Sequence, residues 1–306
     1  MSAKPDMSVN FGGIRMKNPV MVASGTFGYG PEYADLVDLN KLGAIVVKGI
    51  CLKPTKGNET PRTVEVASGL INAIGLPGPG VDGFVKDYMP FLRKFDVPVI
   101  VNIWGKTIEE YAEVTERFNA VDGVAGLEVN LSCPNIKEGS AVFGTNLDMF
   151  KRCIAACRAK TKLPLMPKLA PNVSDIVEYA KAAEDGGADA ISLINSFPAM
   201  AVDIETRRAK LANVTGGLTG PAIKPIAIRL VWQAAQAVNI PVCGIGGIYH
   251  ADDAIEFMTV GADTIAVGTA SFTHPDTAEK VIAGIEAYLV RHGHHRVGEI
   301  VGTFGK

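Results

Sequence analysis

Short apolar runs rich in β-branched residues alternate with amphipathic helical patterns along most of the chain. Most of these runs are apolar on both faces, which is typical of a parallel sheet covered by helices. Helical patterns lie between them at residues 108–121, 147–160, 174–187 and 221–238. Eight runs predict buried strands, at residues 19–24, 44–49, 97–105, 124–132, 163–171, 188–196, 240–248 and 263–271.

Eight strands that alternate with helices predict an α/β fold of the closed (β/α)8 TIM-barrel type, with an open doubly wound sheet as the alternative. Two insertions interrupt the regular spacing, at residues 50–80 after the second strand and at residues 195–220 after the sixth. Insertions after strands lie on the C-terminal face, where barrels place their active sites, so we expect both to serve function. Because no linker or low-complexity segment appears, we expect one domain over residues 1–306.

Composition narrows the classes of partner and compartment. With 306 residues and a formal net charge of -2, the chain has no excess of positive charge for binding nucleic acid or an anionic membrane. The N-terminus lacks the apolar core of a signal peptide, and no segment is apolar for long enough to cross a bilayer. The five cysteines are an odd set without a CxxC pair. We therefore expect a cytoplasmic protein with neither disulfides nor a metal site.

Polar side chains appear where the predicted strands end. The first six strands are apolar until their last positions and then present a specific polar group. A single polar residue at a strand end often only satisfies a loop, but six strands that share the feature predict a ligand site. In chain order these groups are Ser24, Lys48, Asn102, Asn130 with Cys133, Lys168, and Asn195 with Ser196.

The last two strands end in glycines instead. The sequence GIGG occupies residues 244–247, and VGTA occupies residues 267–270. Loops after the seventh and eighth strands of a barrel commonly hold a phosphate on backbone N–H groups. Glycine lets the backbone approach such an anion closely. The pair of motifs therefore predicts a ligand that carries a phosphate.

The two lysines at strand ends allow three interpretations. Glu128 alternates with Asn130, so it is expected to point into the barrel and could pair with a lysine at the barrel mouth. Lys168 could instead form a Schiff base, as in barrel aldolases. The third interpretation, which the phosphate motifs favour, is a fixed positive charge facing a cofactor that becomes anionic when it is reduced.

Several of these stretches occur together, in the same order, in one known family. The chain resembles dihydroorotate dehydrogenase, most closely the class 1B catalytic subunit. Members of that family are FMN-containing (β/α)8 barrels that oxidise dihydroorotate to orotate in pyrimidine biosynthesis. The stretches that carry the resemblance are NAIGLPGPG, LEVNLSCPN, MPKLAP, IETRR, LANVTGGLTGPAIKP, CGIGGI and AVGTA.

The resemblance implies one FMN per chain. Asn102 and Asn130 would hydrogen-bond the isoalloxazine region, and Lys168 would lie near its pyrimidine edge. The remaining FMN contacts would come from Ala23, Ser24, Gly25, Lys48, Gly49, Ile194 and Gly220, with the phosphate on Gly246, Gly247, Gly268 and Thr269.

The resemblance also implies a substrate site and a general base. Side-chain amides suit orotate, which carries amide and carboxylate groups. Cys133 would remove the proton from C5 of dihydroorotate while a hydride passes from C6 to N5 of FMN, and activity would rise with pH as the thiolate forms. Substrate contacts would come from Lys48, Asn72, Ala73, Ile74, Gly75, Leu76, Asn130, Asn135, Asn195 and Ser196.

Cys133 excludes the membrane-bound class, which has serine as its base. The remaining classes are a fumarate-linked homodimer and an NAD-linked assembly, and residues 203–208 and 216–225 resemble the NAD-linked form. In that form a second subunit carries FAD and an iron–sulfur cluster and passes electrons to NAD. The chain itself has no Rossmann fingerprint after its first strand and no cluster-binding cysteine set. We therefore expect a homodimer that joins the partner subunit in a heterotetramer.

Two hypotheses from other classes remain open at this point. A Schiff-base aldolase using Lys168 would be a colourless protein that borohydride traps with a carbonyl substrate. A barrel that serves only as a partner subunit would have lost catalysis, which the intact set of Cys133, Lys168 and asparagines argues against.

Overall fold

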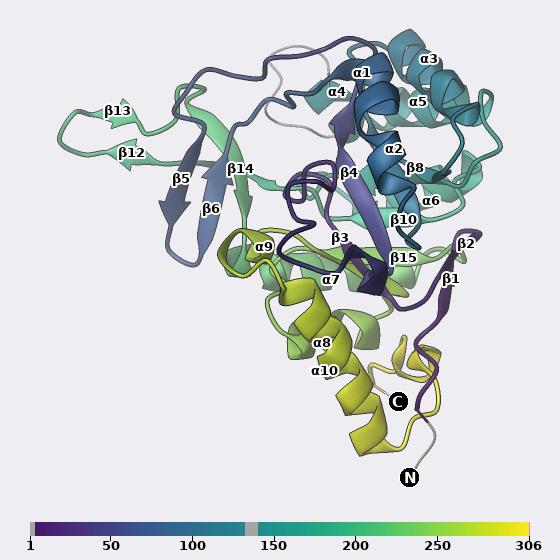
Figure 1. The fold of residues 1–306 in the computed structure, drawn as a ribbon. Helices are drawn as coiled ribbons and strands as arrows, with labels where there is room; N and C mark the ends of the chain where they lie inside the picture. Colours follow the sequence, from purple (N-terminus) through teal and green to yellow (C-terminus); the bar gives the residue numbers. More distant parts are fainter. Residues whose placement is uncertain (1–3, 132–139, 306) are drawn as a thin grey trace.

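The computed structural model describes residues 4–131 and 140–305 of the chain. Within these residues eight strands close into a barrel, and parallel pairing joins each strand to the next along the chain (Figure 1). The predicted (β/α)8 fold is confirmed, and each predicted strand is one of the barrel strands. In order around the barrel they are β3 (Val20–Val22), β4 (Ala44–Ile50), β7 (Val99–Ile103), β8 (Val124–Asn130), β9 (Leu165–Leu169), β10 (Ile191–Leu193), β15 (Val242–Ile245) and β16 (Thr264–Val267).

Helices surround the barrel, and side-chain caps begin several of them. Thr107 and Asn146 each accept a hydrogen bond from the backbone N–H three residues further on, which satisfies a free donor of the first turn. The helices are α1 (Gly80–Asp87), α2 (Met89–Leu92), α3 (Ile108–Asn119), α4 (Ser140–Thr145), α5 (Leu147–Arg158), α6 (Ile176–Asp185), α7 (Lys224–Ala235), α8 (Ala251–Thr259), α9 (Ala270–Thr273) and α10 (Thr277–His292), with 3-10 turns η1 (Leu39–Lys41), η2 (Pro221–Ile223) and η3 (Val297–Ile300).

The four helical patterns of the sequence correspond to α3, α5, α6 and α7. The last begins later than its pattern, because residues 221–223 form the turn η2 and Pro225 occupies the first turn of α7. Proline is tolerated there, since the first N–H groups of a helix have no partner within the helix.

Side chains of the barrel strands alternate between two apolar clusters, one outside the barrel and one inside it. Outward residues such as Ile45, Val101 and Leu127 pack in the larger core, which includes buried residues of the surrounding helices. Inward residues such as Val46 and Met166 form a second cluster inside the barrel. An N-terminal hairpin, β1 (Val9–Phe11) and β2 (Ile14–Met16), adds Phe11, Ile14 and Met16 to this inner cluster. The hairpin was not among the predicted elements.

The two insertions pair with each other. Strands β5 (Thr63–Val66) and β6 (Gly69–Asn72) come from the first insertion, and β11 (Phe197–Met200) and β14 (Thr215–Thr219) come from the second. They form one antiparallel sheet in the order β11-β14-β6-β5, which lies beside the barrel (Figure 1). A short hairpin of β12 (Val202–Asp203) and β13 (Arg208–Ala209) projects beyond it (Figure 1).

No helix in residues 4–131 or 140–305 is long and apolar enough to cross a membrane.

Candidate active site

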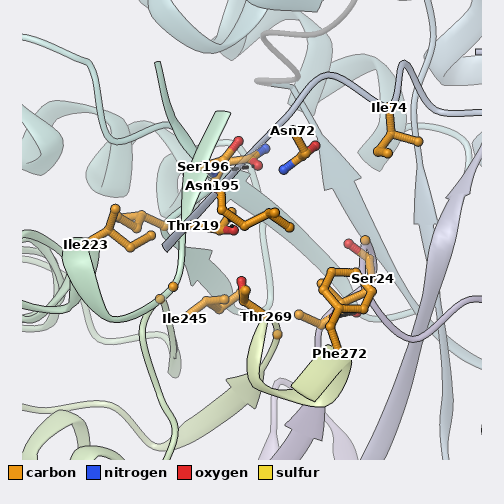
Figure 2. Close-up of a pocket in the computed structure, with 18 of the residues that line it drawn as sticks. Ser24, Asn72, Ile74, Asn195, Ser196, Thr219, Ile223, Ile245, Thr269 and Phe272 are labelled. Atoms are coloured by element: carbon orange, nitrogen blue, oxygen red, sulfur yellow. Dashed lines mark hydrogen bonds between the residues drawn. The ribbon is translucent and has the colours of Figure 1, made fainter. Parts of the chain in front are cut away.

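A pocket opens at the C-terminal ends of the barrel strands, and residues from every barrel strand or the loop that follows it line it. Figure 2 shows Asn72, Asn195 and Ser196 close together on one side, with Thr269, Ser24 and Phe272 on the other. Strands of the inserted sheet contribute Thr63, Leu70 and Thr219. The pocket therefore lies between the barrel and the sheet that the two insertions form.

A buried carboxylate lies inside the barrel, beneath the floor of the pocket. Glu128 points into the barrel from β8 and is 2% exposed. Its Oε2 accepts a hydrogen bond from Asn102 Nδ2 at 2.6 Å, and its Oε1 accepts one from Ser192 Oγ at 2.8 Å. The Nζ atom of Lys168 lies 3.9 Å from Oε2. The pairing of Glu128 with a strand-end lysine, one of the three interpretations that the sequence allows, is present in the structure.

The hydrogen bond to Glu128 fixes the orientation of the Asn102 amide. Its side chain is fully buried, and its Oδ1 atom has no hydrogen-bond partner among the described residues. A Cβ atom added to Gly49 would lie 2.9 Å from that oxygen, so glycine at this position lets the amide approach the end of β4. A buried amide oxygen beside a pocket is suited to accept a hydrogen bond from a ligand.

Two further asparagines, Asn130 and Asn195, contact each other beside the pocket. Asn195 Nδ2 donates to Asn130 Oδ1 at 3.0 Å, and the backbone N–H of Ser196 donates to Asn195 Oδ1 at 2.9 Å. The hydroxyl of Tyr111, on α3, donates to the carbonyl oxygen of Asn130 at 2.7 Å and fixes the end of β8. These bonds orient two amides beside the pocket before any ligand arrives.

Lys48 supplies a second cationic group. Burial lowers the pKa of its ammonium group, and the nearby positive charge of Arg62 acts in the same direction, whereas Glu32 opposes the change. A partly desolvated ammonium group gains from an anionic ligand, because the ligand replaces the lost hydration.

Glycines line the end of the pocket that follows β15 and β16. Gly247 has a φ of 78°, and a Cβ atom there would lie 2.7 Å from Lys224 Cβ and 3.0 Å from the carbonyl oxygen of Gly220. Neither the backbone conformation nor the space accepts a side chain. Gly246 and Gly268 line the same end and leave the backbone uncovered there, and Thr269 adds a hydroxyl group beside them.

The structure brings nearly all of the predicted site residues together. The exception among the described residues is Ala73, which is buried in a small apolar cluster with Ile71 and Leu211 and does not line the pocket. Cys133 and Asn135 lie outside the described residues. The predicted residues that line the pocket are Ala23, Ser24, Gly25, Lys48, Gly49, Asn72, Ile74, Gly75, Leu76, Asn102, Asn130, Lys168, Ile194, Asn195, Ser196, Gly220, Gly246, Gly247, Gly268 and Thr269.

The other cysteines lack the exposure of a reactive thiol. In the described part of the chain each one is buried and free, and none lines the pocket. Burial raises the pKa of Cys51 to about 11 and that of Cys243 to about 12. Both are therefore protonated and unreactive near neutral pH.

Sequence reasoning missed several pocket residues. Phe272 on α9 is 55% exposed, which is unusual for a phenylalanine and marks it as part of the pocket rim. The prediction used polar residues at strand ends, whereas the missed residues are apolar or aromatic, lie in the insertions or, in the case of Thr26, lie beyond the strand end. The missed residues are Thr26, Thr63, Leu70, Thr219, Ile223, Ile245, Ile248, Tyr249 and Phe272.

Comparison with known proteins agrees with this geometry. The family model described as dihydroorotate dehydrogenase matches residues 6–289. Three similar proteins are named dihydroorotate dehydrogenase B (NAD(+)), catalytic subunit. The one from Pelobacter propionicus is 54% identical over 98% of this chain and 99% of its own length. The one from Geotalea daltonii is 53% identical with the same coverage of both chains, and the one from Geobacter sulfurreducens is 53% identical over 98% of each. The resemblance drawn from the motifs is thus confirmed, and the chain belongs to the dihydroorotate dehydrogenase family.

Proposed function

We propose that this chain is the catalytic subunit of an NAD-linked dihydroorotate dehydrogenase, an FMN-dependent enzyme that oxidises dihydroorotate to orotate in pyrimidine biosynthesis. The observation that carries the proposal is the pocket itself. It combines four amide side chains, two lysines and a glycine-lined end in a chain that is more than half identical to proteins of that name. The whole chain acts as one FMN-binding domain.

The pocket fits FMN in three respects. Its glycine-lined end, at Gly246, Gly247 and Gly268, offers backbone N–H groups to a phosphate. The unpartnered Asn102 Oδ1 offers an acceptor to the isoalloxazine ring. Isoleucines, among them Ile194, supply apolar surface for the ring itself.

FMN, when bound, supplies the hydride acceptor for C6 of dihydroorotate. Cys133 takes the proton from C5, and a thiolate suits this role because it is a base that forms not far above neutral pH. The positive charge of Lys168 would stabilise the negative charge that FMN gains when it is reduced. Lys48 and the amides of Asn72, Asn130 and Asn195 hold the carboxylate and the ring amide groups of the substrate.

Electrons leave through a second subunit that carries FAD and an iron–sulfur cluster. The cysteines of the described chain are buried singly or on one helix, which supports placing the cluster on a partner. We propose a dimer of this chain with two such partners. The match to the dihydroorotate dehydrogenase family argues against the aldolase alternative.

The first experiment is the anaerobic addition of dihydroorotate to the purified chain while its visible absorbance is followed. The proposal expects a yellow protein whose flavin band bleaches. A yellow protein that does not bleach would overturn the substrate assignment, and a colourless protein that FMN does not reconstitute would overturn the cofactor.

A second experiment tests the electron acceptor. Turnover with NAD should require the partner subunit, whereas turnover with fumarate by the chain alone would assign it to the fumarate-linked class.

A further inference from the structure

Glu128 has no part in the chemistry proposed above, yet it contacts two residues that do. It is the buried carboxylate beneath the pocket floor, within hydrogen-bond distance of Asn102 and Ser192 and paired with Lys168. No aspartate or glutamate lines the pocket itself among the described residues. The carboxylate that contacts the pocket residues Asn102 and Lys168 is thus that of Glu128, which lies below the ligand site.

The carboxylate determines which way the Asn102 amide faces. An ionised carboxylate only accepts hydrogen bonds, so the atom 2.6 Å from it must be the amide nitrogen. The amide oxygen is consequently turned away, towards Gly49, where it is buried without a partner in the described structure. If the amide were reversed, its oxygen would face the carboxylate and a donor would lie beside Gly49.

The carboxylate also moderates the charge of Lys168. The ammonium nitrogen is 3.9 Å away, which is longer than a charged hydrogen bond, so its N–H groups are not committed to Glu128. Both side chains are nearly inaccessible, at 8% and 3% exposure, so solvent screens their interaction weakly. Lys168 can therefore donate to a ligand while Glu128 reduces the net positive charge that the ligand experiences.

We propose that Glu128 is a positioning residue of the flavin site: its carboxylate holds the Asn102 amide with the oxygen beside the pocket residue Gly49 and limits the preference of Lys168 for reduced, anionic flavin. The inference rests on the proposed function, because it assumes that FMN occupies the pocket. It assigns the affinity for oxidised FMN, and the ratio of the affinities for reduced and oxidised FMN, to a residue that does not line the pocket.

The test compares Glu128→Gln with the wild type. The dissociation constant of oxidised FMN is measured by titrating apoprotein, and the affinity ratio follows from the midpoint potential of bound against free FMN. Removing the carboxylate should raise the ratio in favour of reduced FMN by about tenfold or more, because a buried negative charge close to the site is lost. Binding of oxidised FMN should weaken, because glutamine can present an N–H to Asn102 and reverse its amide.

Two matched variants separate positioning from simple support of the fold. Ser192→Ala removes the bond to the other carboxylate oxygen but keeps the charge, so the affinity ratio should stay within about twofold of wild type. Glu128→Asp keeps the charge but draws it back, so the ratio should be nearly unchanged while oxidised FMN binds more weakly. This variant decides the question if Glu128→Gln does not fold.

An unchanged ratio in a folded Glu128→Gln protein would overturn the inference, as would wild-type affinity for oxidised FMN in Glu128→Asp. These outcomes differ from a failure of the proposed function, in which the wild-type chain itself would not bind FMN.

Discussion

A single methyl group added at Gly247 should test how closely the backbone is packed at the glycine-lined end of the pocket. A non-glycine residue at its φ of 78° costs about 1–2 kcal/mol. The added Cβ would lie 2.7 Å from Lys224 Cβ, and such overpacking costs about 1–3 kcal/mol more. The Cβ atom of Lys224 is fixed by its own backbone, and the Gly220 oxygen is a backbone atom, so no side-chain rotation can relieve either contact. We expect Gly247→Ala to lower the free energy of unfolding by about 2–5 kcal/mol.

Gly268→Ala is the matched control, since the same methyl group is added on the same rim. Its Cβ would lie 3.5 Å from Ala23 Cβ and 3.9 Å from Thr26 Oγ1, which are ordinary contacts, and its φ lies outside the left-handed region. Apoprotein stability should therefore be unchanged or rise by up to about 1 kcal/mol. The methyl group does fill space between two pocket residues, so FMN binding should weaken even though the fold is intact.

Chemical denaturation of the apoproteins, followed by circular dichroism, gives the two free energies, and titration with FMN gives the affinities. Equal stability of the two variants would refute the packing argument at Gly247. Wild-type FMN affinity in Gly268→Ala would show that this rim does not approach the cofactor.

Three further predictions address the chemistry. Cys133→Ala should retain FMN but slow flavin reduction by dihydroorotate by orders of magnitude in anaerobic stopped-flow measurements, and reduction at the wild-type rate would remove Cys133 as the base. Because burial lowers the pKa of Lys48 from 10.5, orotate affinity should fall with rising pH through a midpoint below 10.5, as the cation that favours the anionic ligand is lost. Spectral titrations from pH 7 upward should show this loss, and Lys48→Met should bind weakly at every pH; a similar pH profile in that variant would assign the titration to another group. Lys168→Met should lower the free energy of unfolding of the apoprotein by about 3 kcal/mol, because it leaves the Glu128 carboxylate buried without a counter-charge. Denaturant unfolding should find most of that loss restored in the double variant Lys168→Met/Glu128→Gln, and a single-variant cost below about 1 kcal/mol would contradict the pairing.

The barrel could be predicted because each strand carries its own local signal. Strands such as β4 and β7 are apolar on both faces over most of their length. Side chains alternate between the two faces of each strand, which places Lys48 on β4 and Asn102 on β7 inward, near the strand ends. A closed parallel barrel aligns all C-terminal strand ends on one rim, so polar strand ends could be assigned to one site without knowledge of any long-range contact.

The rest of the site depends on pairing that no local pattern encodes. Leu218 lies opposite Ile71 in the inserted sheet, although almost half of the chain separates them. The two inserted strands that pair across this distance, β6 and β14, are short and contain glycine, so their β-propensity is weak. Phe272 and Thr63 reach the pocket from a short helix and from this sheet, where neither periodicity nor polarity distinguishes them from structural residues.

The inserted sheet has a consequence for how this family can diverge and be engineered. Strands β6 and β14 are neighbours in one antiparallel register, so the two insertions form a single module that is encoded in two separate places. A one-residue deletion in either strand would turn its side chains to the opposite face and misalign the other insertion. Changes of length in the two segments should therefore be inherited together. A chimera with another family member should keep the inserted sheet that covers the pocket only when both segments come from the same parent.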